Sequence, residues 1–122
     1  MAIRIADLAG KVTVADGAWG TLLDTLGAGA GEVRELWNLT QPDVVRTVAQ
    51  RYVEAGAQII LTNTFRANRL TLERYGLADQ TRQINEAGAQ LSKQAAGERA
   101  AVFGSIGPSG RIVLTGEVTE QQ

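Results

Sequence analysis

The chain has 122 residues, of which 44% are hydrophobic and 20% charged, and its formal net charge is −1. These values are ordinary for one globular domain with a buried core, and the lack of a basic run argues against nucleic acid or an anionic membrane as a partner. The sequence contains no cysteine and no histidine, which excludes disulfides and a thiolate metal site within this chain. No segment approaches the roughly 20 apolar residues of a membrane span, and the N-terminus lacks a signal-peptide core, so we expect a cytoplasmic protein.

Two short elements and a polar loop are predicted at the start of the chain. Residues 3–8 read as a turn or short helix, and residues 11–15 as a strand rich in β-branched side chains. This strand ends in Asp16-Gly17-Ala18-Trp19-Gly20-Thr21, where a carboxylate adjoins flexible backbone whose amides could bind the carboxylate of a ligand. A plain Asp-Gly turn is the alternative and, from these residues alone, the favoured one. A helical turn then begins at Leu22, and the Gly and Ala residues 27–31 predict a mobile loop that is too small to pack.

An amphipathic helix is predicted between Thr40 and Glu54. Thr40 and Asp43 resemble a capping box, and Pro42 lies in the first turn, where its missing N–H costs nothing. Gly56 follows the helix and can adopt the left-handed conformation that closes one. The apolar side chains share one side of this helix and predict that it lies on a sheet: Val44, Val45, Val48, Ala49, Tyr52 and Val53.

The stretch after this helix organises the rest of the chain. Ile59, Ile60 and Leu61 form an unalternated apolar run, which is typical of a strand covered on both faces. Thr62-Asn63-Thr64 then gathers donors and acceptors at the carboxyl end of the strand, the end where parallel α/β folds bind ligands. Strand, helix and strand follow one another in a βαβ order whose crossover is expected to be right-handed.

The second half of the chain repeats this pattern. Residues 69–75 predict a short helix that ends at Gly76, and Asp79 is predicted to cap a longer helix that ends at Gly97. Residues 100–103 predict a third strand, followed by the small and polar residues 104–110, which lack the Gly-Lys-Ser/Thr of a P-loop. Residues 111–115 form an apolar run in the loop, and residues 116–120 resemble the start of another helix. The shared face of the longer helix is formed by Ile84, Ala87, Gly88, Leu91 and Ala95.

Three βα units, each with its strand opening into a polar or glycine-rich loop on the same side, fit an α/β fold that is the N-terminal part of a (β/α)8 TIM barrel. A doubly wound sheet is the second possibility. Because a complete barrel needs roughly 250 residues, residues 1–122 are expected to form a partial barrel domain that is incomplete at the C-terminus. The open edge of its last strand would then be covered by self-association or by a partner chain.

Three segments resemble those of the homocysteine S-methyltransferases, a family that includes the homocysteine-binding domain of cobalamin-dependent methionine synthase and betaine–homocysteine methyltransferase. Residues 16–21 resemble the family's Asp-Gly-Ala-Met-Gly-Thr segment, with Trp19 in place of the usual Met. Residues 35–65, from Glu35-Leu36-Trp37-Asn38-Leu39 to Thr62-Asn63-Thr64-Phe65, resemble the run into the second barrel strand. Residues 104–110 resemble the third-strand loop. The segments occur in the family's order and at its spacing over almost the whole chain.

The resemblance implies a substrate site at the ends of the strands. In the family, the first-strand loop holds the amino-acid end of homocysteine, with backbone amides on the carboxylate and acidic side chains near the ammonium. Carried over residue by residue, the substrate-binding set is Asp16, Gly17, Ala18, Asn63, Thr64 and Ser105.

Structural roles stay open for part of this set and its neighbours. Asn63 and Thr64 could instead satisfy backbone groups where the strand ends, and a glycine-rich loop needs a residue as small as Ser105 for its shape alone. Trp19 and Trp37 are expected to pack. Glu35 and Asn38 would either order the loop over the pocket or begin a helix.

The family's enzymes activate the thiol with zinc, which is held by cysteines in the later strands of the barrel. Bound zinc keeps sulfur as thiolate at neutral pH and orients it for attack on the methyl donor. The chain has no cysteine, so catalytic residues and metal ligands are not assigned here, and we expect the chain alone to be inactive.

Three interpretations follow. The favoured one is the N-terminal part of a homocysteine-type S-methyltransferase, whether a fragment or a split subunit, that binds homocysteine or a related thiol. The others are a half-barrel that binds a small molecule without catalysis, and a structural subunit of a larger assembly. These residues do not determine the methyl donor, whether folate, betaine, S-methylmethionine or a corrinoid.

Overall fold

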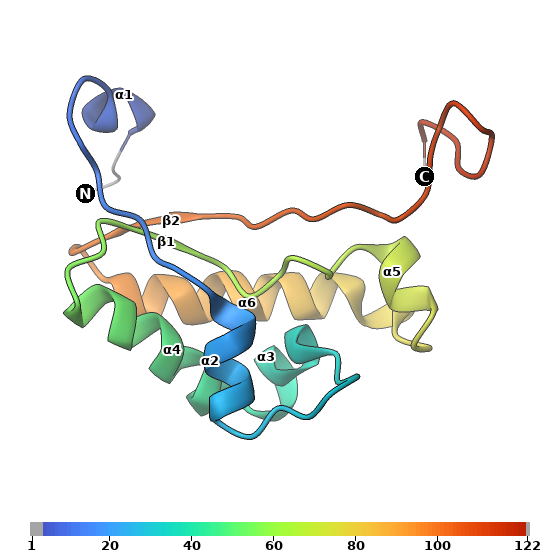
Figure 1. The fold of residues 1–122 in the computed structure, drawn as a ribbon, viewed down its shortest axis with the longest axis horizontal. Coiled ribbons are helices and arrows are strands. Elements are labelled where there is room, and N and C mark those ends of the chain that lie inside the picture. The colour runs from blue at the N-terminus through green and yellow to red at the C-terminus, as the bar shows by residue number, and fades with distance from the viewer. Residues whose placement is uncertain (1–3, 122) are drawn as a thin grey trace.

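The computed structural model describes residues 4–121, in which the longer helices lie on one face of a two-stranded parallel sheet and the short N-terminal helix lies on the opposite side (Figure 1). The longer helices α4 and α6 lie beneath the strands in this view, with α2 in front of them. In chain order the helices and strands are α1 (Ile5–Leu8), α2 (Trp19–Thr25), the 3-10 turn η1 (Arg34–Leu36), α3 (Trp37–Thr40), α4 (Pro42–Glu54), β1 (Ile59–Leu61), α5 (Arg69–Glu73), the 3-10 turn η2 (Ala78–Gln80), α6 (Thr81–Ala96) and β2 (Ala101–Phe103). Residue 3 of the predicted lead-in helix lies outside the described range.

The sheet confirms two of the three predicted strands. β1 and β2 pair in parallel with Ile60 opposite Val102, and Ile60 is completely buried against α4 and α6. The predicted strand at residues 11–15 is wrong in extent, because only Ala15 forms a β-bridge, to Ile59. Val12 is 93% exposed, so the extended backbone before Ala15 gains little by continuing the ladder.

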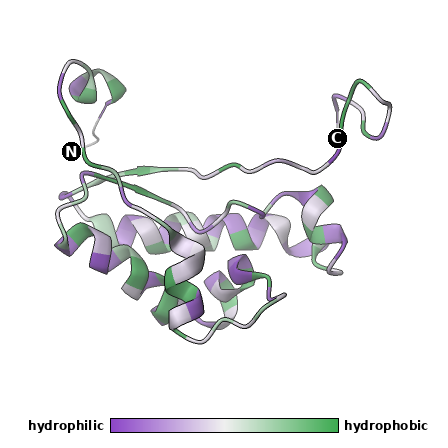
Figure 2. Cartoon of the chain, in the orientation of Figure 1, coloured by the Kyte–Doolittle hydropathy of each residue, from purple (hydrophilic) through white to green (hydrophobic). Residues whose placement is uncertain are grey.

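The amphipathic prediction for α4 is confirmed. Its buried side chains join Ile60 and the end of α6 in a cluster made of Ala49, Val53, Ala57, Ile60, Ala96 and Ala100. A second cluster joins α4 to α2 and α6, and contains Leu23, Ala28, Val45, Val48 and Leu91. Figure 2 shows the hydrophobic positions of the strands and of α4 in green. The sheet and the two long helices therefore share one continuous core.

Neither predicted N-terminal cap forms. Thr40 belongs to α3, where its hydroxyl donates to Leu36 O (3.3 Å), and the residue that precedes α4 is Gln41. Asp79 lies within η2, which runs directly into α6. η2 leads into α6 as a turn that is already helical, and Ala78 O accepts the N–H of Thr81. Before α4, Gln41 has φ −138° and ψ 53°, its carbonyl accepts the N–H groups of Val44 and Val45, and no side-chain cap forms.

Three smaller predictions also need correction. The helix predicted to begin at Leu22 begins at Trp19. The loop at residues 27–31 does pack in part, since Ala28 is only 8% exposed and lies in the second cluster. Residues 116–120 form turns and bends, not a helix; Gly116 has a φ of 75°, and Glu117 accepts the backbone N–H of Ile112 (3.1 Å), which folds this segment back on itself.

Glycine closes the helices as predicted, with φ values of 100° at Gly56 and 51° at Gly97.

Within residues 4–121, no helix combines the length and apolar character needed to cross a membrane.

Gly88 lets α6 approach the end of β1. A Cβ at this position would lie 2.6 Å from Asn38 Nδ2 and 2.8 Å from Thr64 Cγ2, closer than real contacts allow. Asn38 and Thr64 are 3% and 7% exposed, so neither can move into solvent without losing buried hydrogen bonds. Gly88 lies inside a helix, where glycine is usually unfavourable, because the side chains of Asn38 and Thr64 occupy the space that a Cβ would fill.

We expect Gly88→Ala to destabilise the fold. Overpacking costs about 1–3 kcal/mol, against a gain of about 1 kcal/mol in helix propensity, and the displaced Asn38 amide would lose bonds as well. Urea denaturation measures the difference. Gly104→Ala is the matched control, because no atom lies within 4 Å of its Cβ and it should be neutral; an equally stable Gly88→Ala variant would contradict the close approach.

Candidate functional site

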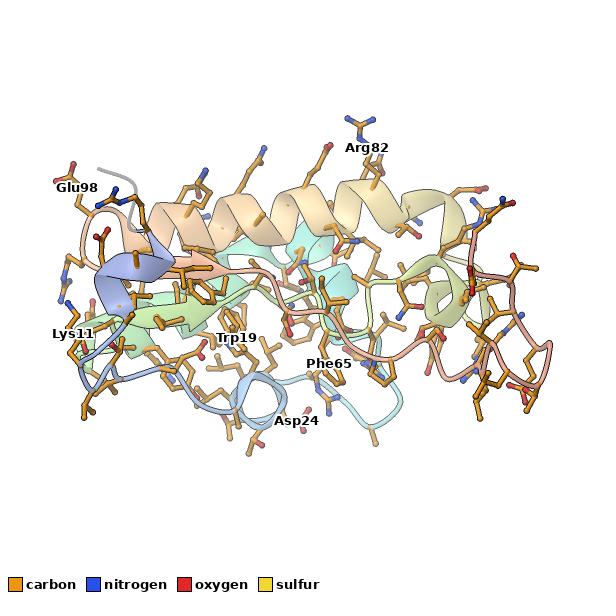
Figure 3. All side chains as sticks on the ribbon, turned by 90° about the horizontal axis from the view of Figure 1, so that it is seen from above. Lys11, Trp19, Asp24, Phe65, Arg82 and Glu98 are labelled. Atoms are coloured by element: carbon orange, nitrogen blue, oxygen red, sulfur yellow. The ribbon has the colours of Figure 1, made fainter. Side chains whose placement is uncertain are left out.

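A cleft of about 430 Å³ lies at the carboxyl ends of the strands. It is lined by the loop after residue 15, by η1, and by the loops that follow β1 and β2. Figure 3 shows Trp19 and Phe65 on the same side of the strands, with Asp24 on the adjacent α2, while Arg82 projects from α6 on the other side and Glu98 lies just beyond the C-terminal end of α6. The lining residues are Gly17, Trp19, Gly20, Arg34, Glu35, Leu61, Thr62, Asn63, Thr64, Phe65, Arg66 and Ser105.

The Asp16 carboxylate connects the first loop to the end of β1. Its Oδ2 accepts the indole N–H of Trp19 (2.7 Å) and the backbone N–H of Leu61 (2.7 Å). Oδ1 has no protein donor among the described residues, and Trp19 and Leu61 both line the cleft. Asp16 therefore holds its neighbours with one oxygen and keeps the other available.

Tyr52, on α4, holds the same loop through a hydrogen bond. Its hydroxyl donates to Ala18 O (2.7 Å). A Cβ on Gly17 would lie 3.1 Å from the hydroxyl oxygen of Tyr52. Burial, and then the nearby charge of Asp16, raise the pKa of Tyr52 above its ordinary value. The phenol thus stays neutral and able to donate over the whole physiological pH range.

Two buried asparagine amides fix the loop after β1. Asn38 Nδ2 donates to Asn63 O (2.8 Å) and Ile84 O (3.0 Å), while Asn63 Nδ2 donates to Asn38 Oδ1 (3.0 Å) and Arg34 O (3.0 Å). Asn38 therefore orders the loop, the first of the two roles considered for it. Asn63 keeps Oδ1 without a protein donor in residues 4–121.

The threonine hydroxyls close a ring between the loops that follow β1 and β2. Ser105 N donates to Thr62 Oγ1 (3.0 Å), the Thr62 and Thr64 hydroxyls lie 2.6 Å apart, and Thr64 Oγ1 donates to Ser105 O (2.8 Å). Because the Thr64 hydroxyl donates its one proton to Ser105 O, the Thr62 hydroxyl must donate to Thr64. The Ser105 hydroxyl takes no part in the ring and has no partner among the described residues.

Two arginines complete the cleft. Arg66 donates to the buried carboxylate of Glu35 (Nη2–Oε2 3.3 Å), which is 4% exposed as a residue. Arg34 makes a two-pronged pair with Asp24 through Nε (2.8 Å) and Nη2 (2.9 Å). Each positive charge therefore faces a carboxylate.

The residues present do not fit a zinc site that activates a thiol. Such sites use soft sulfur ligands, and the sequence has neither cysteine nor histidine. Within residues 4–121, no three Asp or Glu side chains are grouped so that they could hold a metal ion.

Residues 13–122 match the homocysteine S-methyltransferase family model. The chain belongs to the homocysteine S-methyltransferase family, which confirms the resemblance found in its three segments.

Among curated relatives, the methionine synthases of Mycobacterium leprae (strain TN) and Mycobacterium tuberculosis (strain ATCC 25618 / H37Rv) are 36% and 34% identical over 121 residues. Each alignment covers 89% of this chain and 10% of the relative, so the chain spans about a tenth of the length of these proteins. Among solved structures, the Escherichia coli homocysteine methyltransferase MmuM superposes with a TM-score of 0.72 in its metallated form, at 25% identity, over 87% of this chain and 41% of that one. The oxidized form gives 0.69 at 26% identity, over 84% and 40%.

The structure brings four of the predicted substrate-binding residues to the cleft. Gly17, Asn63, Thr64 and Ser105 line it, whereas Asp16 and Ala18 are not among the lining residues. Substrate binding by all of them stays a prediction. Sequence reasoning missed Tyr52 and Arg66: Arg66 directly follows the polar run and could have been noticed there, but Tyr52 is one of several apolar positions on α4 and nothing in the sequence marks it.

Tyr52→Phe should loosen the first loop. Loss of the bond to Ala18 O costs about 0.5–1.5 kcal/mol. Because the folded pKa of Tyr52 lies above the ordinary value of 10.0, its contribution is fully present below pH 10 and is lost as pH rises through the folded pKa. Urea denaturation at pH 8 and above pH 10 should show the parent losing its advantage over the variant. Tyr75→Phe, which removes a hydroxyl with no partner in residues 4–121, is the control; an unchanged difference at the two pH values would refute the coupling.

Proposed function

We propose that this chain is the N-terminal part of a homocysteine-type S-methyltransferase, a partial (β/α)8 barrel that forms the amino-acid pocket for methyl transfer to a thiol. One observation carries the proposal. The three segments that resemble the family converge on a single cleft at the carboxyl ends of the strands, which is where parallel α/β enzymes bind their substrates. Further strands of the barrel would pair with the free edge of β2.

The cleft offers the groups that an amino-acid end requires. Asp16, beside the cleft, would supply a negative charge for the ammonium through Oδ1, and the backbone around Gly17, in the lining, would supply N–H groups. Asn63 Oδ1 and the Ser105 hydroxyl add an acceptor and a donor that no residue within 4–121 uses. The surrounding hydrogen bonds hold these groups in place before a ligand arrives, which reduces the entropic cost of binding.

These residues bind and orient the amino acid but do not make its sulfur reactive. A free thiol has a pKa near 8.5, so only a few per cent is thiolate at neutral pH. The family's zinc would supply the missing thiolate, and its soft ligands are absent from this chain.

Asp16→Asn should weaken homocysteine binding by roughly ten- to a hundredfold, since one charge-assisted contact is worth about 1.5–3 kcal/mol. The amide oxygen of Asn can still accept from Trp19 and Leu61, so the loop should keep its shape. Calorimetry measures the affinity, and Asp43→Asn, at a carboxylate that is 89% exposed and pairs with Arg46, is the matched control. Equal affinities for Asp16→Asn and the parent would remove Asp16 from the site.

The chain alone should neither retain stoichiometric zinc nor methylate homocysteine. Metal analysis after dialysis, combined with a methyl-transfer assay, measures both. Activity that appears only when a cysteine-bearing partner is added would support a split enzyme. Stoichiometric zinc together with turnover above background would contradict the division of roles.

A further inference from the structure

Arg66 differs from the other ion-paired arginines in the depth of its partner. The carboxylates that face Arg4, Arg34, Arg46, Arg82 and Arg111 are 45–89% exposed, whereas the side chain of Glu35 is 6% exposed. Exposed pairs are screened and exchange freely with water. A buried carboxylate holds its cation in place, because leaving either charge unpaired is costly.

Every polar group on one side of Arg66 is used. Its backbone N–H donates to Glu35 Oε1 (3.1 Å), Nε lies 3.5 Å from the same oxygen, and Nη2 donates to Glu35 Oε2 (3.3 Å) and Glu32 O (3.0 Å). Nη1 has no acceptor among the described residues. Arg66 lines the cleft and its side chain is 30% exposed, so a fixed guanidinium keeps two N–H donors for a ligand.

The charges nearby limit what that ligand can be. Arg66 is balanced by Glu35, Arg34 is balanced by Asp24, and Asp16 adds one more negative charge beside the cleft. Two arginines and three carboxylates leave one excess negative charge here, so a multiply charged anion such as a phosphate is repelled more strongly than a singly charged carboxylate. A single carboxylate suits a planar guanidinium that has one nitrogen, Nη1, with unpaired N–H groups.

We propose that Arg66 is a specificity-determining residue that binds a carboxylate in this cleft and that Glu35 is the positioning residue that orients it. The assignment rests on the proposed function. The carboxylate belongs either to the thiol amino acid or to the methyl donor, and the two sources can be separated by experiment.

The test compares three variants of the 122-residue chain by calorimetry. Arg66→Gln removes the charge. Arg66→Lys keeps a charge for Glu35 but cannot hold Glu35 and a ligand carboxylate with separate nitrogens, so it serves even if the Gln variant fails to fold. Arg69→Gln makes the same change at an exposed arginine outside the cleft. The ligands are homocysteine, 3-aminopropane-1-thiol, which has the same amine and thiol without the carboxylate, and glycine betaine.

If Arg66 binds the carboxylate of the thiol, homocysteine affinity should fall at least tenfold in both Arg66 variants and stay unchanged in Arg69→Gln. The binding of 3-aminopropane-1-thiol should be weaker in the parent and insensitive to Arg66. If Arg66 binds the carboxylate of the donor, only the affinity for betaine should fall.

Unchanged affinity for both carboxylate ligands in the Arg66 variants would overturn the assignment and leave the proposed function intact. An equal loss in Arg69→Gln would also overturn it, because the effect would then be general electrostatics. A parent chain that does not bind homocysteine would overturn the proposed function, and the assignment of Arg66 with it.

Discussion

The need to satisfy buried polar groups where β1 ends determines how the rest of the site is arranged. Thr62, Asn63 and Thr64 are each at most 7% exposed, and an unpaired polar group at such depth costs about 1–3 kcal/mol. Their partners come from η1, α3 and the loop after β2. Satisfying one short polar run therefore fixes the relative positions of segments that are far apart in the sequence, and Gly88 makes room for the result.

Periodicity predicts the long elements of this fold well and their ends poorly. The sequence predicts β1 and the apolar faces of α4 and α6 because buried positions require apolar residues, and these recur at regular spacing. Ser92 on α6 was overlooked because it is polar, although it is fully buried and donates to Leu61 O (2.9 Å). The caps at Thr40 and Asp79 could not be excluded from local sequence, since whether a helical turn precedes a helix depends on tertiary packing.

The candidate site divides in the same way. Gly17, Asn63, Thr64 and Ser105 were predicted from the family resemblance, which assigns them to loops that follow predicted strands, and parallel strands bring their carboxyl ends together. The pairing of Glu35 with Arg66 joins residues 31 positions apart, and that of Tyr52 with Ala18 joins residues 34 apart. Contacts of this kind have no period in the sequence, so only the folded chain reveals them.

The hydroxyl ring of Thr62, Thr64 and the Ser105 backbone has a consequence for how such a sequence can drift. Each hydroxyl both accepts and donates within the ring. Replacing one threonine by valine would therefore leave a buried donor or acceptor of its neighbour without a partner. Replacement of both would remove the mismatch between the side chains but leave two backbone groups of Ser105 without partners. Positions 62 and 64 are therefore not independent, and serine is the one natural substitution that keeps the ring at either of them with the same order of donors.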